Sequence, residues 1–464
     1  MKKFTYVDLF SGAGGLSIGF ANAGFNLEFA SDISSDALET FRSNLDIIHP
    51  EISDDRIIHG DIRELYEVIS EKKVRTRTEG VDTVASKAER MLKKGVPDVR
   101  KDEKIHEVLK SIQEIDVLAG GPPCQGFSII GRSKRATVEE RMKGFIDDPR
   151  NQLFKYFLKF AERYNPRVVL IENVAGLASA SSYRDIIERS LRKTGRGYDV
   201  SSEILNASDF GIPQNRKRLF FIGVRRDLKK GGQHRASRDI FSILNERKED
   251  VVNLEEAVSC LPIIKAKPLP NNKLKGEEIC FTKEDSYGMN QSSLEYNDLV
   301  NKSSAYVDRI NRFRGKRMEP QVLSNHFSRY HNDNDLWIYS NLKPGLYLNH
   351  PSNAKALRKI TYGVEKGSDG KLKVRNFRDK YFRLNPCGVS KTIVAHLAKD
   401  GNSFVHPYQN RSISPREAAR IQSFPDWYKF EGSMTSQFRQ IGNAVPPILA
   451  GKIAEAVKVF LQNN

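Results

Sequence analysis

The sequence contains few cysteines, and none of them forms a metal-binding pair. Its four cysteines, Cys124, Cys260, Cys280 and Cys387, are widely separated and include no C-x-x-C pair. This spacing argues against a disulfide framework and against a zinc module, so we expect no metal site. A single cysteine in an unusual local sequence is instead a candidate nucleophile.

Long apolar runs are also absent. No stretch reaches about 18 apolar residues, which predicts that the chain has no transmembrane helix. The first residues, Met1 to Thr5, lead directly into a strand-like run without the apolar segment and small-residue cleavage site of a secretion signal. We therefore expect an intracellular protein.

Acidic residues are too few to balance the basic ones. The 75 Lys and Arg against 58 Asp and Glu give a formal net charge of +17. Such an excess indicates a polyanionic partner, usually nucleic acid, although a generally basic surface would also produce it. Residues 309–317 and 355–383 are especially basic, and five aromatic residues are interleaved there: Phe313, Tyr362, Phe377, Tyr381 and Phe382. The combination suits phosphate contact and base stacking, and a solvated surface with buried aromatics is the alternative.

Strand and helix patterns alternate along the first half of the chain. We predict strands at 4–10, 27–30, 56–59, 115–119, 167–171 and 219–224, separated by helix-like stretches. This alternation predicts an α/β fold with a mostly parallel sheet. Residues 71–114 interrupt the rhythm with two amphipathic helices, which we expect to serve structural packing, with a nucleic-acid or partner contact as the alternative. From about residue 227 the regular alternation stops.

A glycine-rich turn joins the first predicted strand to a helix. Residues 8–15 read DLFSGAGG, and glycine allows a tight turn and lets a ligand approach the main chain. Asp32 ends the second strand, where its carboxylate could accept hydrogen bonds from ribose hydroxyls. Asp61 follows the third strand and could accept one from an adenine amino group. No lysine follows the glycines, so the turn is not a P-loop. S-adenosylmethionine (AdoMet) and a dinucleotide both fit these residues.

Cys124 lies in an exceptional local sequence. Residues 119–128 read AGGPPCQGFS, in which Pro122 and Pro123 stiffen the chain and the flanking glycines keep the cysteine accessible. A packed core thiol would not need this setting. Glu172 ends a buried-type strand, and ligands of α/β proteins bind beyond the carboxyl ends of strands. We therefore expect its carboxyl group in the ligand crevice.

A third polar segment, residues 214–218, reads QNRKR and precedes the strand at 219–224. At this alternating spacing Gln214, Arg216 and Arg218 are predicted to share one face of an extended chain. A surface charge patch is the alternative explanation for the arginines.

Taken in order, these motifs resemble the C5-cytosine DNA methyltransferase family. The series runs from the glycine loop through Pro-Pro-Cys-Gln, Glu-Asn-Val and Gln-x-Arg-x-Arg to closing motifs at 416–425 and 440–446. The resemblance implies an AdoMet-dependent methyltransferase (Rossmann-like) catalytic domain at 1–226 and a smaller target-recognition domain at 227–410. A C-terminal segment, 411–464, would return to the catalytic domain. The 71–114 insertion is longer than is usual in the family, and Asp32 stands where glutamate is common.

The resemblance also implies the reaction and its residues. Such an enzyme moves a methyl group from AdoMet to C5 of a cytosine flipped out of a specific duplex DNA site. Cys124 would add to C6 of the ring, and Glu172 would bind N3 and the exocyclic amine. Arg218 would hold O2, and Arg216 would order the catalytic loop or meet a phosphate. The implied cofactor residues, with Phe10 packing on the adenine, are Phe10, Gly12, Gly14, Gly15, Leu16, Asp32, Ile33, Asp61, Ile62, Pro123 and Asn443.

The implied partners are double-stranded DNA and, by similarity to stand-alone bacterial enzymes, a cognate restriction endonuclease. We expect a monomer in a prokaryotic cytoplasm, associated with the nucleoid. A tRNA cytosine methyltransferase would share the catalytic motifs, but the long basic segment before residue 416 favours duplex DNA. An NAD-dependent dehydrogenase or a non-catalytic DNA-binding module leaves the cysteine motif unexplained. An amino-methyltransferase would carry an Asp/Asn/Ser-Pro-Pro-Tyr motif instead.

Overall fold

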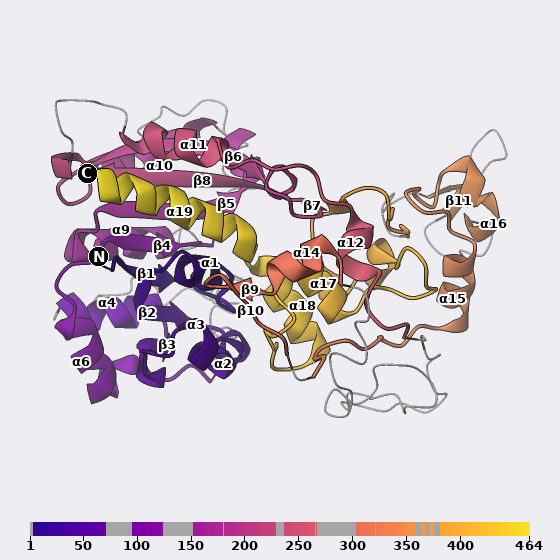
Figure 1. Ribbon diagram of the computed structural model, residues 1–464, viewed down its shortest axis with the longest axis horizontal. Coiled ribbons are helices and arrows are strands. Elements are labelled where there is room, and N and C mark those ends of the chain that lie inside the picture. The colour runs from indigo at the N-terminus through magenta and orange to yellow at the C-terminus, as the bar shows by residue number, and fades with distance from the viewer. Residues whose placement is uncertain are drawn as a thin grey trace. The chain divides into compact units, whose positions relative to one another are not determined.

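The chain forms two compact units in the computed structural model (Figure 1). The described residues are 3–70, 95–123, 152–179, 181–228, 236–264, 266, 303–320, 322–357, 364–366, 372–374 and 381–464. The sheet unit comprises Met1–Asn206, Lys217–Lys248 and Val445–Asn464, and the second unit comprises Ala207–Arg216 and Glu249–Ala444. These compact units do not coincide with the domains expected to end at 226 and 410. Residues 227–248 fall in the sheet unit, and residues 207–216 and 411–444 fall in the second unit.

A seven-stranded sheet forms the centre of the sheet unit, in the order β3-β2-β1-β4-β5-β8-β6. β8 is antiparallel to its neighbours β5 and β6, and the other pairings are parallel, which confirms the α/β fold with a mostly parallel sheet. The inner strands are buried along most of their length, as strands covered by helices require. The strands are β1 (Thr5–Leu9), β2 (Asn26–Asp32), β3 (Ile57–His59), β4 (Val117–Gly120), β5 (Val168–Val174), β6 (Tyr198–Asn206) and β8 (Lys217–Arg225).

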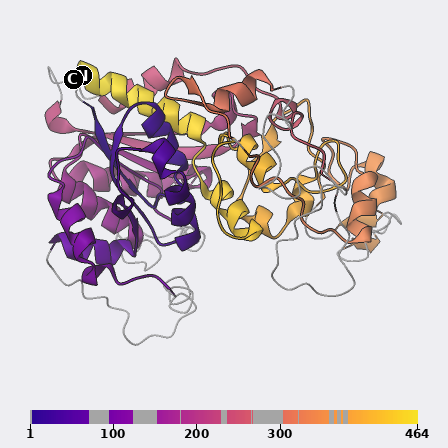
Figure 2. The same cartoon turned by 60° about the horizontal axis from the view of Figure 1, so that its bottom comes forward.

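Helices pack against this sheet in two groups. α1 and α11 each pack against α19, and α4 packs against α6 and α9. α19 lies along the sheet in both views (Figures 1 and 2). The apolar side chains of the helices and strands share one core, in which Phe157 and Phe160 are fully buried. The helices are α1 (Gly15–Asn22), α2 (Ser35–Ser43), α3 (Leu45–Ile48), α4 (Ile62–Ser70), α6 (Glu103–Ser111), α9 (Gln152–Tyr164), α10 (Ser181–Lys193), α11 (Ala236–Asn245) and α19 (Pro447–Asn463).

α6 confirms the second helix expected within residues 71–114. Val108 and Leu109 of α6 are buried in the core, and the Asp102 side chain caps the helix by accepting a hydrogen bond from the Ile105 N–H. The first expected helix lies outside the described residues. The described part of the insertion therefore serves packing, as expected.

The edge strand β6 is not predicted from the sequence. Its central residues, 201–203, read SSE and have weak strand preference. Arg192 and Arg184 of α10 donate hydrogen bonds to the carbonyl oxygens of Val200 and Ser202, at 3.3 and 2.7 Å. Charged side chains thus cover the outer edge of β6, where another strand could otherwise pair.

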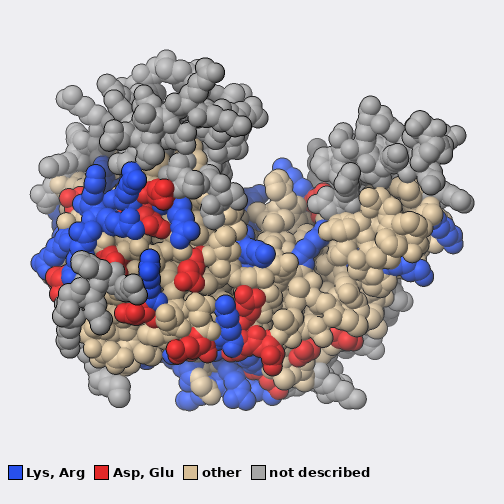
Figure 3. Space-filling model, turned by 90° about the horizontal axis from the view of Figure 1, so that it is seen from above, with Lys and Arg blue, Asp and Glu red and all other residues tan. Residues whose placement is uncertain are grey.

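Positive charge on this side of the sheet unit is partly neutralised locally. Figure 3 views the side on which α10, α11 and β6 lie, where Lys and Arg gather beside Asp and Glu. Arg184 and Arg192 both pair with Glu188, at 3.3 and 2.7 Å. The net charge of the chain therefore does not by itself identify this face as a nucleic-acid contact.

The first and last helices of the sheet unit meet at two glycines. A methyl group at Gly19 of α1 would overlap the backbone nitrogen of Gly451 and the side chain of Ala450 in α19. A methyl group at Gly451 would instead meet Gly19 at 3.8 Å, an ordinary contact. The end of the chain thus packs directly on the helix that follows the glycine loop.

We expect Gly19→Ala to lower the free energy of unfolding by about 1–3 kcal/mol, the usual effect of overpacking. This loss should prevail although alanine favours a helix over glycine by about 1 kcal/mol. Gly451→Ala is the matched control, and it is expected to stabilise because it gains helix propensity without overlap. Urea unfolding measures both changes, and equal effects of the two substitutions would contradict the described packing.

The second unit is built from short helices, two-stranded sheets and loops. Buried guanidinium groups satisfy many loop carbonyls; Arg383 donates to those of Leu342, Tyr339 and His406, at 3.1, 2.6 and 2.7 Å. The helices are α12 (Leu254–Val258), α14 (Ala305–Ile310), α15 (Asp333–Ser340), α16 (Ala354–Leu357), α17 (Pro415–Ile421) and α18 (Met434–Asn443). The strands are β7 (Gln214–Asn215), β9 (Arg312–Phe313), β10 (Lys316–Arg317), β11 (Val364–Lys366), β12 (Leu372–Val374) and β13 (Ser390–Lys391).

Two of the aromatic residues expected to stack on bases belong to the core of the second unit. Phe313 is buried and packs edge-on against Trp427 at 5.5 Å between ring centroids. Tyr381 is also buried, and its hydroxyl donates to Asp335 at 2.6 Å. The base-stacking expectation is wrong for these two rings, because each fills an apolar core. Tyr362 and Phe377 lie outside the described residues.

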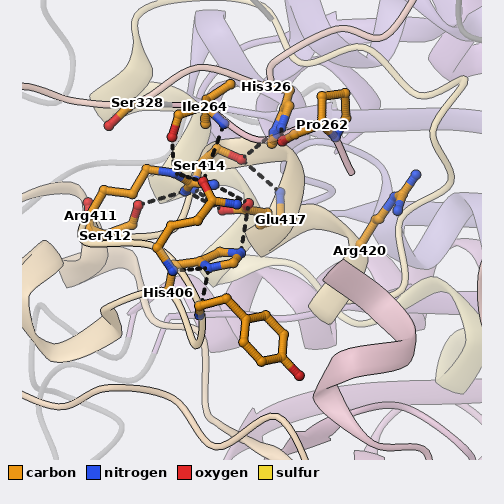
Figure 4. A network of polar contacts seen from close by, with 12 residues as sticks. Pro262, Ile264, His326, Ser328, His406, Arg411, Ser412, Ser414, Glu417 and Arg420 are labelled. Carbon is orange, nitrogen blue, oxygen red and sulfur yellow. Dashed lines mark hydrogen bonds and ion pairs between the residues drawn. The ribbon is translucent and has the colours of Figure 1, made fainter. Parts of the chain in front are cut away.

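A buried ion pair anchors α17 (Figure 4). The Arg411 guanidinium contacts both carboxylate oxygens of Glu417, at 2.8 and 2.6 Å. Ser414 and Glu417 also form a capping box at the start of the helix. Burial alone would raise the pKa of Glu417, but the positive charge of Arg411 holds it well below its usual value.

Three buried histidines lie in the same network. Burial lowers the pKa of His326 to about 4, and those of His331 and His406 to about 3. His326 Nδ1 lies 2.9 Å from the Ser414 hydroxyl and Nε2 lies 2.9 Å from the Pro262 carbonyl oxygen (Figure 4). A carbonyl can only accept, so the neutral ring carries its proton on Nε2.

We expect the second unit to lose stability as the pH falls from about 6.5 towards 4. Unfolded histidine binds a proton near pH 6.5, whereas folded His326 binds one only near pH 4. The unfolded state therefore binds more protons in this window, and the free energy of unfolding falls by about 1.4 kcal/mol per pH unit for each such histidine. Because the pKa of Glu417 is lowered, its contribution is lost only below its ordinary value of 4.5.

Chemical unfolding of the full chain between pH 7 and 5 measures this dependence. His326→Gln can keep both hydrogen bonds without titrating, so its pH dependence should be shallower. His350→Gln, at an exposed histidine, is the matched control for this substitution. A pH slope in His326→Gln as steep as that of the unchanged chain would contradict the buried neutral state of His326.

Candidate active site

Two adjacent strands end where the predicted catalytic residues lie. A side chain at Gly120, the last residue of β4, would overlap the Leu9 carbonyl oxygen of β1. A side chain at Gly121 would lie 3.3 Å from Oε2 of Glu172 on β5. Glycine at 120 thus lets β4 lie close to β1, and glycine at 121 lets the Glu172 carboxyl group lie against the main chain that leads to Cys124.

Asn173 holds the same segment, and it was not among the predicted site residues. Its side chain is buried, and its Nδ2 donates to the Pro122 carbonyl oxygen at 3.4 Å. The Glu-Asn-Val motif could have pointed to Asn173, because this asparagine directly follows the predicted carboxyl residue Glu172. Pro123 is exposed at the end of this segment. Cys124 and the residues after it, up to 151, lie outside the described residues.

Arg218 meets Glu172 across the strand pair β5–β8. The register places Arg218 opposite Val174, two residues from Glu172, so the two side chains lie on the same face of the sheet. Arg218 Nε is 3.0 Å from Glu172 Oε1, and their side chains are 16% and 14% exposed. The structure thus joins a carboxyl group and a guanidinium group from two separate motifs, and leaves both accessible to a ligand.

One strand face through Gln214, Arg216 and Arg218 is not formed, and this expectation is wrong. β7 ends at Asn215 and β8 begins at Lys217, so the extended chain breaks at Arg216. The break arises because the Arg216 N–H donates to the Gln214 carbonyl oxygen at 3.0 Å, which bends the chain.

Arg216 binds main-chain carbonyls within the second unit. It is 1% exposed, and its guanidinium donates to the carbonyl oxygens of Ile393, Gly442 and Ala444, at 2.8, 3.1 and 3.0 Å. Gly442 and Ala444 flank Asn443, whose side chain is exposed at the end of α18. Arg216 therefore fixes the main chain on both sides of a residue implied in cofactor binding.

The glycine loop after β1 closes on Asp32. The N–H of Gly12 donates to Asp32 Oδ2 at 2.9 Å, and that of Ser34 donates to Oδ1 at 2.8 Å. Phe10, Gly12 and Gly14 have φ angles of 59°, 53° and 72°, a left-handed path that glycine adopts without strain. Burial raises the pKa of Asp32, while the two N–H donors oppose the increase. A side chain at Gly12 would meet nothing within 4 Å, so the loop is open there.

The remaining predicted cofactor residues lie beside this loop at strand and helix ends. Gly15 and Leu16 begin α1, Ile33 directly follows β2 and Ile62 begins α4. Each is therefore carried by the carboxyl end of β1, β2 or β3, where α/β proteins bind nucleotides.

Two further carboxyl groups shape the site. Asp61 accepts hydrogen bonds from Arg63 Nε and Nη2, at 2.9 and 2.5 Å, so an adenine amino group would share it with Arg63. Asp8 is buried behind the loop and accepts from the Ser17 hydroxyl at 2.7 Å. Burial raises the pKa of Asp8 to about 7. Asp8 was not predicted as a site residue.

The described residues contain no group of His, Cys, Asp and Glu side chains that could hold a metal ion. Among the helices described, none combines the length and the apolar character needed to cross a membrane.

Comparison with known proteins connects this geometry to a family. Residues 4–71 and 84–459 match the family model of C-5 cytosine-specific DNA methylases. The chain is 32% identical to the type II methyltransferase M.AgeI of Thalassovita gelatinovora, over 98% of this chain and 99% of that one. It is 30% identical to the type II methyltransferase M.DdeI of Desulfomicrobium norvegicum, over 98% and 89%.

A solved structure shares the fold. It is that of a prophage-encoded Escherichia coli protein described as a DNA modification methyltransferase, with a TM-score of 0.60, 24% identity, and coverage of 99% of this chain and 100% of that chain. The fold, the strand-end residues and the family match agree, and the chain belongs to the C-5 cytosine-specific DNA methylase family as a DNA (cytosine-5-)-methyltransferase.

Proposed function

We propose that this enzyme methylates a cytosine flipped out of a specific duplex DNA site, through a covalent bond between Cys124 and C6 of the base. The observation that carries the proposal is the Arg218–Glu172 pair, 3.0 Å apart, beside the segment that leads into Cys124. A carboxyl group and a guanidinium group can together bind the polar edge of a cytosine, while a thiolate approaches the ring.

Each residue has a distinct task in this chemistry. C5 of cytosine is a weak nucleophile, and addition of the Cys124 thiolate to C6 makes C5 electron-rich. Glu172 holds N3 and the exocyclic amine and shares a proton as negative charge develops on the ring. Arg218 holds O2. Loss of the C5 proton to a base then restores the ring double bond and releases the thiolate.

The residues present fit AdoMet, which when bound supplies an electrophilic methyl group. The loop is open at Gly12, and Asp32 is half-buried, so its carboxylate can accept hydrogen bonds from a ribose. Phe10 offers a ring beside the same loop for the adenine. We also assign Asn443 to cofactor binding, and Arg216 holds the main chain on either side of it. We assign Arg216 this positioning role, because its guanidinium is buried among carbonyl oxygens.

The second unit would read the DNA sequence. Rotating a base out of the duplex costs a few kcal/mol, which protein contacts to the DNA offset. The relatives M.AgeI and M.DdeI are named type II methyltransferases, which supports a role in protecting DNA from a cognate restriction endonuclease.

Bisulfite sequencing of DNA from cells that express the chain tests the proposal. We expect cytosines in one short sequence context to resist conversion, and purified enzyme to transfer tritium from labelled AdoMet to duplexes carrying that sequence. Labelling of tRNA in place of duplex DNA would overturn the proposed substrate, and so would the absence of a preferred context.

A further inference from the structure

Three aromatic rings of the second unit surround the ammonium group of Lys391. Lys391 Nζ lies 4.8 Å from the ring centroid of Phe404, 5.0 Å from that of Phe382 and 5.9 Å from that of Tyr347. Tyr347 and Phe382 also contact each other, at 4.6 Å between centroids. A cation is attracted to aromatic faces within about 6 Å, so all three rings contribute to its position.

The main chain around Lys391 is fixed as well. Lys391 pairs with Asn215 between strands β13 and β7. On the next residues, the Thr392 hydroxyl donates to the Asn215 carbonyl oxygen at 2.7 Å, and the Ile393 N–H donates to Gln214 Oε1 at 2.8 Å. Backbone and ring contacts together restrict a side chain that is ordinarily flexible.

The ring cluster has a buried side and a solvent side. Phe404 is 3% exposed and forms the base, whereas Tyr347 is 42% exposed and is among the large apolar side chains that the described surface leaves open. Lys391 is half-buried between them. Tyr347 therefore marks the side of the ring cluster that faces solvent.

Lys391 pairs with a residue that lies close to Arg218 in the sequence. Asn215, which pairs with Lys391, precedes Arg218 by three residues in the Gln-x-Arg-x-Arg motif. A cation on this strand pair is therefore connected by a short stretch of chain to the guanidinium group proposed to hold the cytosine.

We propose that Lys391, held by Tyr347, Phe382 and Phe404, binds one backbone phosphate of the DNA substrate. The inference rests on the proposed function, because it presupposes duplex DNA as the substrate. An ammonium group is a point charge without the planar fork that reads guanine, so a phosphate is its natural partner. The contact is independent of sequence, and the rings lower its entropic cost by ordering the side chain before binding.

Lys391→Gln tests this role in binding measurements with two duplexes, one carrying the site found by bisulfite sequencing and one with that site scrambled. Fluorescence anisotropy at several salt concentrations gives the affinity and its salt slope. Loss of one phosphate contact should lower the slope by about 0.9 and weaken binding at 0.1 M salt by about 8-fold. Both duplexes should lose affinity equally, since phosphate contacts carry no base information. AdoMet affinity should stay unchanged.

Matched variants distinguish the effect of the Lys391 charge from that of the surrounding rings. Lys391→Arg keeps the charge and should retain the salt slope. Lys429→Gln, at an exposed lysine of the same unit that pairs with Glu431 at 2.8 Å, should leave both slope and affinity unchanged. Tyr347→Leu keeps the charge but removes a ring, so we expect an unchanged slope with affinity reduced a few-fold.

Three results would overturn the inference: a wild-type salt slope in Lys391→Gln, a loss confined to the duplex that carries the site, or wild-type affinity in Tyr347→Leu. If the wild-type chain showed no salt-dependent binding to either duplex, the proposed function itself would fail, so the two failures are distinguishable.

Discussion

Replacing Cys124 with serine is expected to abolish methyl transfer, lowering turnover by roughly 10⁴-fold or more, the order lost when a covalent nucleophile is removed. A serine hydroxyl does not ionise near neutral pH, so it cannot add to C6 as a thiolate does. Most of the implied cofactor residues lie at the ends of β1, β2 and β3, and the substitution leaves the neighbouring Pro123 unchanged. AdoMet binding should therefore be retained.

Tritium transfer from labelled AdoMet to a cognate duplex measures the first effect, and calorimetric titration with AdoMet measures the second. Cys387→Ser is the matched control, because Cys387 is an exposed free thiol of the second unit. It should methylate at the wild-type rate. Turnover by Cys124→Ser that equals that of the control would refute the nucleophile assignment.

Glu172→Gln is expected to lower kcat by about 10²- to 10⁴-fold, the usual contribution of a positioned acid or base. Arg218 Nε lies 3.0 Å from Oε1 of Glu172, and glutamine keeps a side-chain oxygen at this position. The geometry of the pair should therefore persist in the variant. What it removes is the negative charge and the proton that a carboxyl group can share with the ring. The loss should appear mainly in kcat, with a smaller change in KM.

The matched control for this substitution is Glu188→Gln. Glu188 also pairs with arginines in the sheet unit, Arg184 and Arg192, but it lies on α10 beside the edge strand. Its variant should retain kcat. Steady-state kinetics of both variants settle the comparison, and a wild-type kcat in Glu172→Gln would remove the carboxyl group from the proposed chemistry.

Hydrophobic patterning was sufficient to predict most of the sheet. The six predicted strands are apolar runs bounded by turns, and such runs form where a strand is buried on both faces. β6 was not predicted because an edge strand needs less apolar character. Its outer carbonyl groups accept hydrogen bonds from the side chains of Arg184 and Arg192, and such contacts leave no strand pattern in the sequence. The second unit is held by buried arginines such as Arg383, and these contacts leave no periodic signal in sequence.

Sequence motifs pointed to individual residues of the candidate site but not to their arrangement, and they did not point to Asp8 or Asn173. Motifs identified Glu172 and Arg218, but their contact depends on the antiparallel register of β5 and β8, which no local pattern specifies. For Arg216, the sequence spacing predicted the wrong arrangement. Its alternating spacing with Arg218 indicated a shared face, yet a turn and three carbonyl partners from distant segments place it in the second unit. Long-range hydrogen bonds decided the outcome there, and sequence spacing does not encode them.

A duplex containing 5-fluorocytosine at the target position tests the central chemistry most directly. Fluorine at C5 cannot leave as a proton does, so the bond between the cysteine sulfur and C6 should persist after methylation. We expect a protein–DNA complex that survives denaturation, forms only with AdoMet present and is absent for Cys124→Ser. Failure of the active wild-type enzyme to form this complex on its own recognition site would contradict covalent catalysis by Cys124.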